Sequence, residues 1–451
     1  MNQEPQTGVL RSARVLIIGL IAVLVVPGLA LVFAAISNTA APTTTQTEER
    51  DVLANSTNEC VTCHRQSTPG IVEQYSRSTM ATSVTCQNCH EVAADYPGAV
   101  EHEGTYVLNQ PTTAMCQSCH QAEVAQFMQS RHSLPAYVAM TGVDELSPEH
   151  TAIYQAIPEA ELGPDQTRNA LFAIEGPDIT RFACESCHNV GRPAPDGSIG
   201  ECQQCHLRHE FSLEQARRPE TCNACHIGPD HPQWEIYQES PHGIAYATGG
   251  DSWNWDAEPG TLTVNDFPAP TCSTCHFSGF GASGTTHDVG DRLTWYLFAP
   301  VSSRRPNWQE NQTAMQNVCL ECHNDNFITQ YYADADVATE YVNERVNEVN
   351  AMVQPLRDAG LLSATPFDEV IEFTIFENWH HWGRTAKFGV WMQGADYVQW
   401  HGIYEMLSDT AEIEEYVNNM LPAEATPEAT AEAASETAPE VTPEATPESG
   451  G

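Results

Sequence analysis

The sequence is poor in aromatic and basic residues. Its 451 residues include only 14 Phe, 9 Trp and 14 Tyr, too few to fill the interior of so long a chain by themselves. Lys and Arg number 19 against 60 Asp and Glu, for a formal net charge of -41. This excess of acidic residues argues against nucleic acid as a partner. It is typical of a solvated surface, and it also suits the steering of a basic redox partner.

No cysteine is left over for a disulfide, because all 16 fall in eight Cys-x-x-Cys-His motifs. Two thiols one helical turn apart can bond the two vinyl groups of haem, and the following His can ligate the iron. Zinc knuckles and thioredoxin-like pairs do not explain a His after every pair. The sequence therefore predicts eight covalently bound c-type haems, and the binding residues are Cys60, Cys63, His64, Cys86, Cys89, His90, Cys116, Cys119, His120, Cys184, Cys187, His188, Cys202, Cys205, His206, Cys222, Cys225, His226, Cys272, Cys275, His276, Cys319, Cys322 and His323.

The two ends differ from the middle in composition. Residues 1–36 contain an apolar run long enough to span a bilayer after Arg11 and Arg14, so we expect a membrane anchor or signal segment and favour the anchor. Residues 37–50 are expected to form a flexible linker, and residues 421–451 a disordered acidic tail of Pro, Thr and Glu. Either N-terminal reading predicts an exported haem domain on the extracytoplasmic face of the membrane.

Sustained periodicity is absent from residues 51–335, which we interpret as an octahaem domain of short helices and turns with haem as its core. Residues 336–420 are expected to form a C-terminal region of long helices. The first helix is predicted from about Asp336 to Gly360, and a second helical stretch from about Pro366 to Asn419 with a break near Gly394. We predict a mainly α multihaem cytochrome c fold. The apolar face of the first helix is expected at Ala338, Val342, Val346, Val349, Val353 and Leu356.

Ten of the 18 His lie outside the motifs and could supply second ligands to the irons. An electron conduit would seal every iron with two protein ligands, whereas an enzyme needs one iron with an open face. Ten spare imidazoles permit both arrangements. They are His102, His132, His150, His209, His231, His242, His287, His380, His381 and His401.

The segment from Cys184 to Gly243 resembles the hydroxylamine oxidoreductase family of octahaem cytochromes. The resemblance lies in three closely spaced motifs, the run CxxCHxRHEFS, the link ARRPETC and the DHP that follows, and it extends over roughly residues 51–415. It implies that the fourth haem, on Cys184, Cys187 and His188, is catalytic. Asp230 and His231 match the family's distal pair, and Tyr397 matches the Tyr that crosslinks to this haem from a neighbouring subunit of a trimer.

The resemblance also implies second ligands. These are His102, His132, His209, His242, His287 and one of His380 or His381, for which we choose His381. Where the family has a further His, this chain has Met80, which would give one haem a His/Met pair and a higher potential. A third pocket residue, a Tyr, falls near Tyr296. Each assignment has a plainer alternative: Asp230 could cap a turn, Tyr397 could be a packed helix residue, and Met80 could be an ordinary apolar side chain.

We therefore predict a hydroxylamine dehydrogenase that yields nitric oxide or nitrite at a crosslinked haem and passes electrons through seven others. Hydrazine oxidation is a close variant. A reductase that makes ammonia from nitrite or hydroxylamine and a non-catalytic conduit are the alternatives; the Tyr397 match argues against the first, and the DHP motif against the second. The expected partners are a small nitrogenous substrate, a c-type cytochrome or quinone-linked redox protein, the membrane, and two further copies of the chain.

Overall fold

A computed structural model describes residues 51–158, 168–277 and 279–421. The predicted membrane segment and linker, and all but the first residue of the predicted acidic tail, lie outside the described residues. In the described ranges no helix is long and apolar enough to cross a membrane. The chain divides into two compact units, Met1–Ala54 and Asn55–Gly451, and every element named below belongs to the second.

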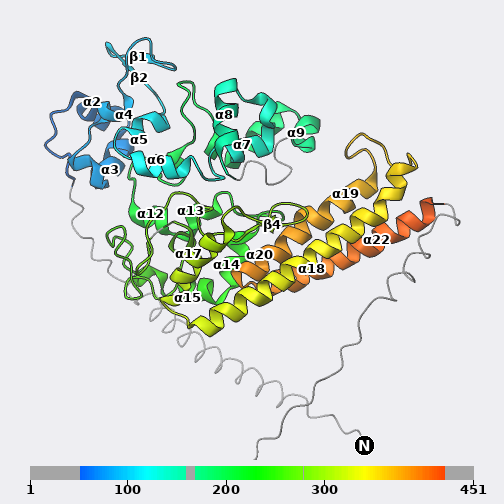
Figure 1. Ribbon diagram of the computed structural model, residues 1–451. Helices are drawn as coiled ribbons and strands as arrows, with labels where there is room; N and C mark the ends of the chain where they lie inside the picture. The colour runs from blue at the N-terminus through cyan, green and yellow to red at the C-terminus, as the bar shows by residue number, and fades with distance from the viewer. Residues whose placement is uncertain (1–50, 159–167, 278, 422–451) are drawn as a thin grey trace, which may run out of the picture. The chain divides into compact units, whose positions relative to one another are not determined.

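The second unit is mainly helical, as predicted, and its N-terminal half consists of short helices joined by turns (Figure 1). The first elements along the chain are α2 (Glu59–Ser67), α3 (Pro69–Arg77), η1 (Thr79–Thr82), α4 (Cys86–His90), β1 (Val100–His102), β2 (Thr105–Val107), α5 (Thr113–Gln117), α6 (Gln121–Phe127), α7 (Leu134–Thr141), η2 (Val143–Glu145), α8 (Pro148–Ala156), α9 (Ala170–Glu175) and α10 (Pro177–Phe182). Those that follow are α11 (Glu185–His188), η4 (Asn189–Gly191), η5 (Cys202–Gln204), α12 (Leu213–Arg217), α13 (Pro219–Asn223), α14 (Gln233–Glu239), α15 (Pro241–Gly249), η6 (Gly250–Ser252) and α16 (Cys272–His276).

Two motif helices start at a capping residue directly before the first Cys. Thr85 and Asn88 form a capping box at the start of α4, and Thr271 and Thr274 form one at the start of α16. Such a cap satisfies the free N–H groups of the first turn and fixes where the helix begins. Because residues three apart lie on one face of a helix, the cap also places the two thiols of the motif on the same side.

Longer helices follow in the C-terminal part: α17 (Trp308–Leu320), α18 (Asp325–Asp358), α19 (Val370–Glu377), η7 (Asn378–Gly383), α20 (Arg384–Met392), α21 (Ala395–Val398), η8 (Gln399–Ile403) and α22 (Tyr404–Met420). Helix α18, yellow in Figure 1, packs against α20 and α22. Val349, Val353 and Leu356 of α18 form a buried cluster with Ile413 and Val417 of α22. Each fully buried side chain of this kind contributes roughly 1.5 to 3 kcal/mol relative to an exposed one.

The predicted first helix is confirmed in its buried face but not in its start. Val342, Val346, Val349, Val353 and Leu356 are all buried. The helix begins at Asp325 rather than Asp336, because Asn324 caps it by accepting a hydrogen bond from the amide of Phe327. Ala338 is only half-buried, and its neighbour Thr339 is the residue that turns fully inward.

The second helical stretch is interrupted where α20 meets α21, which confirms the predicted break near Gly394. Gln393 has a left-handed backbone there, with φ of 65°. A Cβ on Gly394 would lie 2.7 Å from Cγ2 of Ile236 in α14, so only glycine allows this close approach. Between α19 and α20 the chain forms the π-helical turn η7, a wide turn often found at functional sites.

Two short antiparallel hairpins make up the strands of the described residues. In the second, β3 (Trp295–Tyr296) pairs with β4 (Ser303–Arg304), with Trp295 opposite Arg304. Asp336 of α18 holds both ends of this pair, because it accepts a hydrogen bond from the indole of Trp295 at 2.8 Å and bonds Arg304 at 2.7 Å.

Candidate functional site

Five motif histidines each face a second imidazole from a distant part of the chain. Two imidazoles bonded to one iron at about 2 Å, with each ring centre about 1 Å further out, have centroids roughly 6 Å apart. The observed centroid distances run from 5.9 to 6.4 Å. The residues therefore fit haem irons held between the pairs His64–His102, His90–His209, His132–His226, His206–His287 and His242–His323.

The protonation and orientation of these rings also suit iron. Burial and neighbouring imidazoles lower the pKa of His132 to about 3 and of His206 to about 4, which keeps both rings neutral at physiological pH. A neutral imidazole is the form that ligates a metal. The second ring nitrogen is anchored in several motifs: Nδ1 of His90 lies 2.7 Å from the carbonyl of Leu108, and Nδ1 of His188 lies 2.6 Å from that of Ala136. Such anchoring turns Nε2 toward the metal.

The remaining predicted ligands lie outside this set of pairs. The motif residues His120, His188 and His276 do not belong to the five pairs. His381 lies in η7 beside His380, with the two ring centroids 5.4 Å apart. Met80 lies half-buried in the 3-10 turn η1. The ligand roles of His381 and Met80 stay predictions.

The motifs lie next to one another in a connected series. All 16 cysteines are free thiols in this structure, and each stands in for a thioether sulfur. In four cases burial and the thiol of another motif raise the pKa of a cysteine. The pairs, with the affected cysteine first, are Cys86 and Cys60, Cys89 and Cys119, Cys205 and Cys222, and Cys275 and Cys319. Thiol hydrogen bonds join Cys116 to Cys202, Cys187 to Cys225, and Cys222 to Cys272. Every motif is thus linked to another, and the fourth joins the series through the sixth.

An acid–imidazole couple lies beside the fourth motif. Nδ1 of His231 is 2.7 Å from Oδ2 of Asp230, and both side chains are about three-quarters buried, with 25% and 28% exposed. The pKa of the Cys187 thiol is lowered chiefly by its hydrogen bond with Cys225, and it also responds to the charges of His231 and Asp230. The predicted distal pair therefore lies close to the predicted catalytic haem.

Positive charge surrounds the Asp230 carboxylate. Burial acts to raise its pKa, but the hydrogen bond from His231 and the charges of His231, His380 and Arg384 outweigh burial and hold the pKa well below its usual range. Nε2 of His380 and an Nη atom of Arg384 each lie 3.9 Å from the carboxylate. Asp230 therefore stays ionised at all working pH values and can stabilise a proton on His231.

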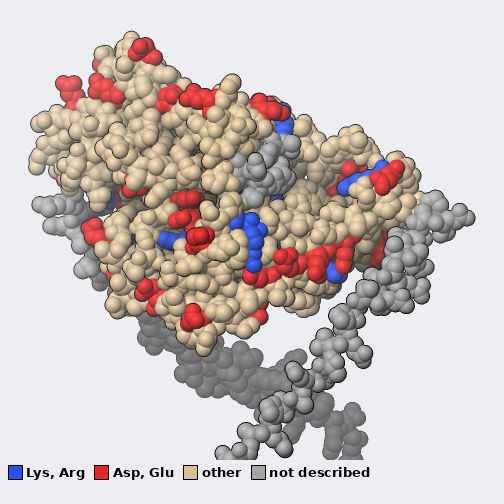
Figure 2. Space-filling view, in the orientation of Figure 1, with Lys and Arg blue, Asp and Glu red and all other residues tan. Residues whose placement is uncertain are grey.

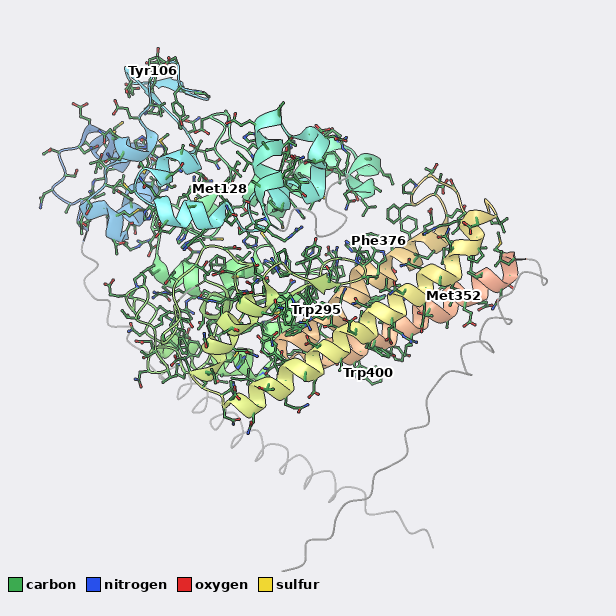
Figure 3. All side chains as sticks on the ribbon, in the orientation of Figure 1. Tyr106, Met128, Trp295, Met352, Phe376 and Trp400 are labelled. Atoms are coloured by element: carbon green, nitrogen blue, oxygen red, sulfur yellow. The ribbon has the colours of Figure 1, made fainter. Side chains whose placement is uncertain are left out.

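His380 is kept neutral in this cluster. The Arg384 guanidinium donates a hydrogen bond to its Nε2 at 3.0 Å, and burial followed by that charge lowers the pKa of His380 to about 2. Its ring stacks at 4.2 Å on Phe376, which Figure 3 labels at the end of α19. Among the described residues, Nδ1 of His380 is buried without a hydrogen-bond partner. Arg384 bonds Nε2 here, so His380 lines the pocket, and the choice between His380 and His381 as a ligand stays a prediction.

Aromatic side chains of the β3–β4 loop cover the other side of the couple. Phe298 lies 5.2 Å from the ring of His231, and Tyr296 lies 6.5 Å from Phe298. Tyr296 is buried, and its hydroxyl accepts a hydrogen bond at 3.0 Å from Arg131, the residue before His132. The structure thus places Tyr296 at the edge of the predicted pocket and Phe298 within it.

Comparison with known families assigns the chain. Residues 82–367 match the family described as seven times multi-haem cytochrome CxxCH, and this range contains the seven motifs from Cys86 to Cys319. The chain belongs to this family. Residues 33–91, which include the first motif, also match the family described as cytochrome c554 and c-prime. The protein is a multihaem cytochrome that carries c-type haems and takes part in redox chemistry.

Relatives of this cytochrome confirm the predicted resemblance at the level of the family. It is 28% identical over 371 residues to a probable nitrite reductase-hydroxylamine oxidoreductase fusion protein of Kuenenia stuttgartiensis, covering 68% of this chain but only 39% of that protein. The chain thus spans about two fifths of the curated relative. A hypothetical multiheme protein shares the fold with a TM-score of 0.69 at 21% identity, covering 80% of this chain and 94% of the other. A reducing HAO-like protein complex of Kuenenia stuttgartiensis gives 0.59 at 19%, covering 80% and 84%.

Tyr397 of this cytochrome lies in α21, which packs against α20. Its ring is half-buried and stacks at 5.0 Å on His401, whose Nδ1 is 2.7 Å from Asp396. Trp400, labelled in Figure 3, follows on η8 and is 57% exposed. Tyr397 is therefore held at a partly exposed face of the C-terminal helices, and its crosslink stays a prediction.

Sequence reasoning missed Arg384 and Phe298. The spacing of Arg384 four residues after His380 was a usable signal, since residues four apart share a helical face. Nothing local marks Phe298, because its role depends on contact with a segment more than sixty positions away.

Proposed function

We propose that this cytochrome oxidises hydroxylamine to nitric oxide or nitrite at the haem held by Cys184, Cys187 and His188. The observation that carries the proposal is the Asp230–His231 couple at 2.7 Å beside Cys187. An imidazole that faces a carboxylate in this way is suited to accept protons.

The haem, when bound, supplies an iron that can ligate a nitrogen donor and accept its electrons. Oxidation of hydroxylamine to nitric oxide releases three protons along with three electrons, so the site needs a base that can be used repeatedly. His231 accepts a proton, and Asp230 stabilises the imidazolium because its hydrogen bond with His231 and the nearby charge of Arg384 hold it ionised. His380 stays neutral, so it does not repel the charged His231 ring.

The connected motifs support removal of the electrons. The fourth motif touches the sixth through Cys187 and Cys225, and the sixth touches both the fifth and the seventh. Haems held by these motifs would be neighbours, which suits electron transfer from one to the next. Tyr397 is proposed to crosslink the catalytic haem of a neighbouring copy in a homotrimer, which would tune it for electron withdrawal.

The setting of the enzyme is also a proposal. Residues 1–36 would anchor the chain and place the haem domain outside the cytoplasm. The face shown in Figure 2 carries many more acidic than basic side chains. A redox partner, either a c-type cytochrome or a quinone-linked protein, would therefore dock through a basic surface.

The reductive direction is the second candidate. It is favoured by the names of two relatives, a probable nitrite reductase-hydroxylamine oxidoreductase fusion protein and a reducing HAO-like protein complex. The same couple would then donate protons to a nitrogen oxide instead of accepting them. The direction of net proton transfer separates the two reactions.

The experiment is to mix purified, oxidised haem-loaded protein with hydroxylamine and to follow haem reduction by absorbance. Rapid reduction with release of nitric oxide or nitrite supports the proposal. Oxidation of pre-reduced haems by nitrite or hydroxylamine, with ammonia as the product and without the forward reaction, would establish the reductase. Inertness toward both compounds would leave only electron conduction.

A further inference from the structure

Lys387 is completely buried, and its ammonium bonds the loop of the β3–β4 hairpin. Nζ donates hydrogen bonds to the carbonyl of Ala299 at 2.9 Å and to the hydroxyl of Ser302 at 2.8 Å, and it lies 3.5 Å from the carbonyl of Pro300. All three acceptors are uncharged. Burial and the nearby Arg384 charge lower the pKa of Lys387 to about 7, so burying this cation is costly.

Other residues of α20 contact the two segments that form the pocket, which are the β3–β4 loop and the segment that carries Asp230. Nε of Arg384 donates to the carbonyl of Phe298 at 2.8 Å, and the ring of Phe388 lies 5.0 Å from that of Phe298. The hydroxyl of Thr385 donates at 3.1 Å to the carbonyl of Pro229, directly before Asp230. Helix α20 thus fixes both the Asp230–His231 segment and the loop that covers it.

Helix α18 holds the end of the loop from the other side. The side chain of Asn343 accepts from the amide of Ser302 at 2.7 Å and donates to its carbonyl at 3.0 Å. Asn343 therefore holds the loop at Ser302. The ammonium of Lys387 holds the middle of the loop, because it bonds the carbonyl of Ala299 and lies near that of Pro300. A long cationic side chain with several donors suits this task, because neutral apolar side chains would leave buried carbonyls without partners.

We infer that Lys387 is a positioning residue for His231: it holds the 298–302 loop so that Phe298 covers the imidazole and keeps it against Asp230. The inference deepens the proposed function and rests on it only for the chemical role of His231. It assigns Lys387 no contact with substrate or haem.

The test measures how readily His231 reacts with diethyl pyrocarbonate in purified haem-loaded protein, with peptide mass spectrometry as the readout. His401, whose side chain is 56% exposed, serves as the internal reference. Lys387→Met removes the donors, and Lys387→Gln keeps a donor without the charge. Thr339→Val is the matched control, because Thr339 is equally buried in the bundle and its hydroxyl bonds Ala335 and Trp391.

Lys387→Met is expected to speed modification of His231 about tenfold or more relative to His401, since each lost bond from a charged donor weakens loop closure. Lys387→Gln should give a smaller increase, and Thr339→Val none. Amide hydrogen exchange over residues 297–303 should rise in the same order. Equal His231 reactivity in Lys387→Met and wild type, or an equal increase in Thr339→Val, would overturn the inference.

The two proposals fail separately. If the wild-type protein does not react with hydroxylamine but Lys387→Met exposes His231, the proposed function falls and the positioning role stands. If hydroxylamine oxidation depends on Asp230 and His231 while Lys387→Met leaves His231 and the loop unchanged, the positioning role falls alone.

Discussion

The imidazole rings of His132 and His226 lie 5.9 Å apart, although the two residues come from well-separated segments. His226 belongs to the sixth motif, and His132 follows the helix α6 that begins beside the third. Both side chains are half-buried, and burial lowers the pKa of His132 to about 3 and that of His226 to about 4. Two neutral imidazoles at this distance have room for one iron between them and little else.

Replacing His132 should therefore change one haem and leave the others. In His132→Ala, we expect one low-spin signal to disappear from the electron paramagnetic resonance spectrum of the oxidised protein. The midpoint potential of one haem should move by on the order of 0.1 V, because axial ligands set haem potentials. His150→Ala is the control, since the His150 ring bonds the carbonyl of Gly197 and belongs to none of the five pairs. A spectrum identical to wild type would exclude His132 as a ligand.

Asp230→Asn should slow hydroxylamine-dependent haem reduction about 100-fold, because His231 loses the charge that stabilises its protonated form. Stopped-flow absorbance measures the rate. Asp266→Asn removes a carboxylate that accepts hydrogen bonds from Thr263 and Asn254, and it should react at the wild-type rate. Equal rates in the two variants would remove Asp230 from the mechanism.

The same substitution has a predictable pH dependence. The folded-state pKa of Asp230 is depressed, so its contribution to stability is present above the unfolded value of about 3.9 and is lost as pH falls through the lower folded value. The thermal midpoint of Asp230→Asn should therefore lie below that of wild type at pH 7. The difference should shrink as the solution becomes strongly acidic.

The haem-binding residues could be predicted from the sequence because their chemistry is local. Cys60, Cys63 and His64 identify a haem site without any knowledge of the fold. Asp230 and His231 were also found, since they are adjacent and follow a motif of the family. The buried side of α18 was predicted from its periodicity, but its start at Asp325 was missed because the first turns carry no strong apolar pattern.

Residues that act across the fold could not be predicted. Arg384 bonds a carbonyl 86 positions away, and Lys387 bonds one 88 positions away. No spacing rule connects such residues, because the contact arises only when the β3–β4 hairpin packs on α20. A buried lysine looks like any other lysine in sequence.

Asp409→Asn should stabilise the protein in alkaline but not in acidic solution. Burial, followed by the charges of Glu377, Glu412 and Glu405, raises the pKa of Asp409 to about 7. A carboxyl with a raised folded pKa costs stability as pH rises from about 4 through the folded value. After allowance for partial exposure, we expect a gain of about 1 kcal/mol at pH 8.

Thermal melts followed by circular dichroism at pH 4 and pH 8 check this expectation. Asp334→Asn is the control, because Asp334 is exposed on α18, where it accepts a hydrogen bond from Gln330. A higher midpoint for Asp409→Asn at pH 8 with no difference at pH 4 is the expected pattern. An equal gain at both pH values would mean that the charge of Asp409 is not the cause.

Tyr397 is expected to carry a covalent bond to haem in the mature protein. Its position is rigid: a Cβ on Gly402 would lie 2.5 Å from the Tyr397 carbonyl, so η8 packs tightly against α21. Burial and the charges of Glu239, Glu235 and Asp396 raise the pKa of its phenol, which keeps the hydroxyl protonated near neutral pH. A fixed, half-exposed phenol on the C-terminal helices is suited to reach a neighbouring copy.

Mass spectrometry of proteolytic peptides decides the matter. A peptide spanning Tyr397 should carry the mass of the haem attached at Cys184 and Cys187, and Tyr397→Phe should lose both this adduct and hydroxylamine-dependent reduction. Tyr404→Phe is the control and should retain both, because it alters a different exposed Tyr, at the start of α22, whose residue is 50% exposed. An unmodified Tyr397 peptide from mature, active protein would contradict the crosslink. If the same protein also reduced nitrite, the reductase would be favoured, because the crosslink is proposed to tune the haem for withdrawing electrons.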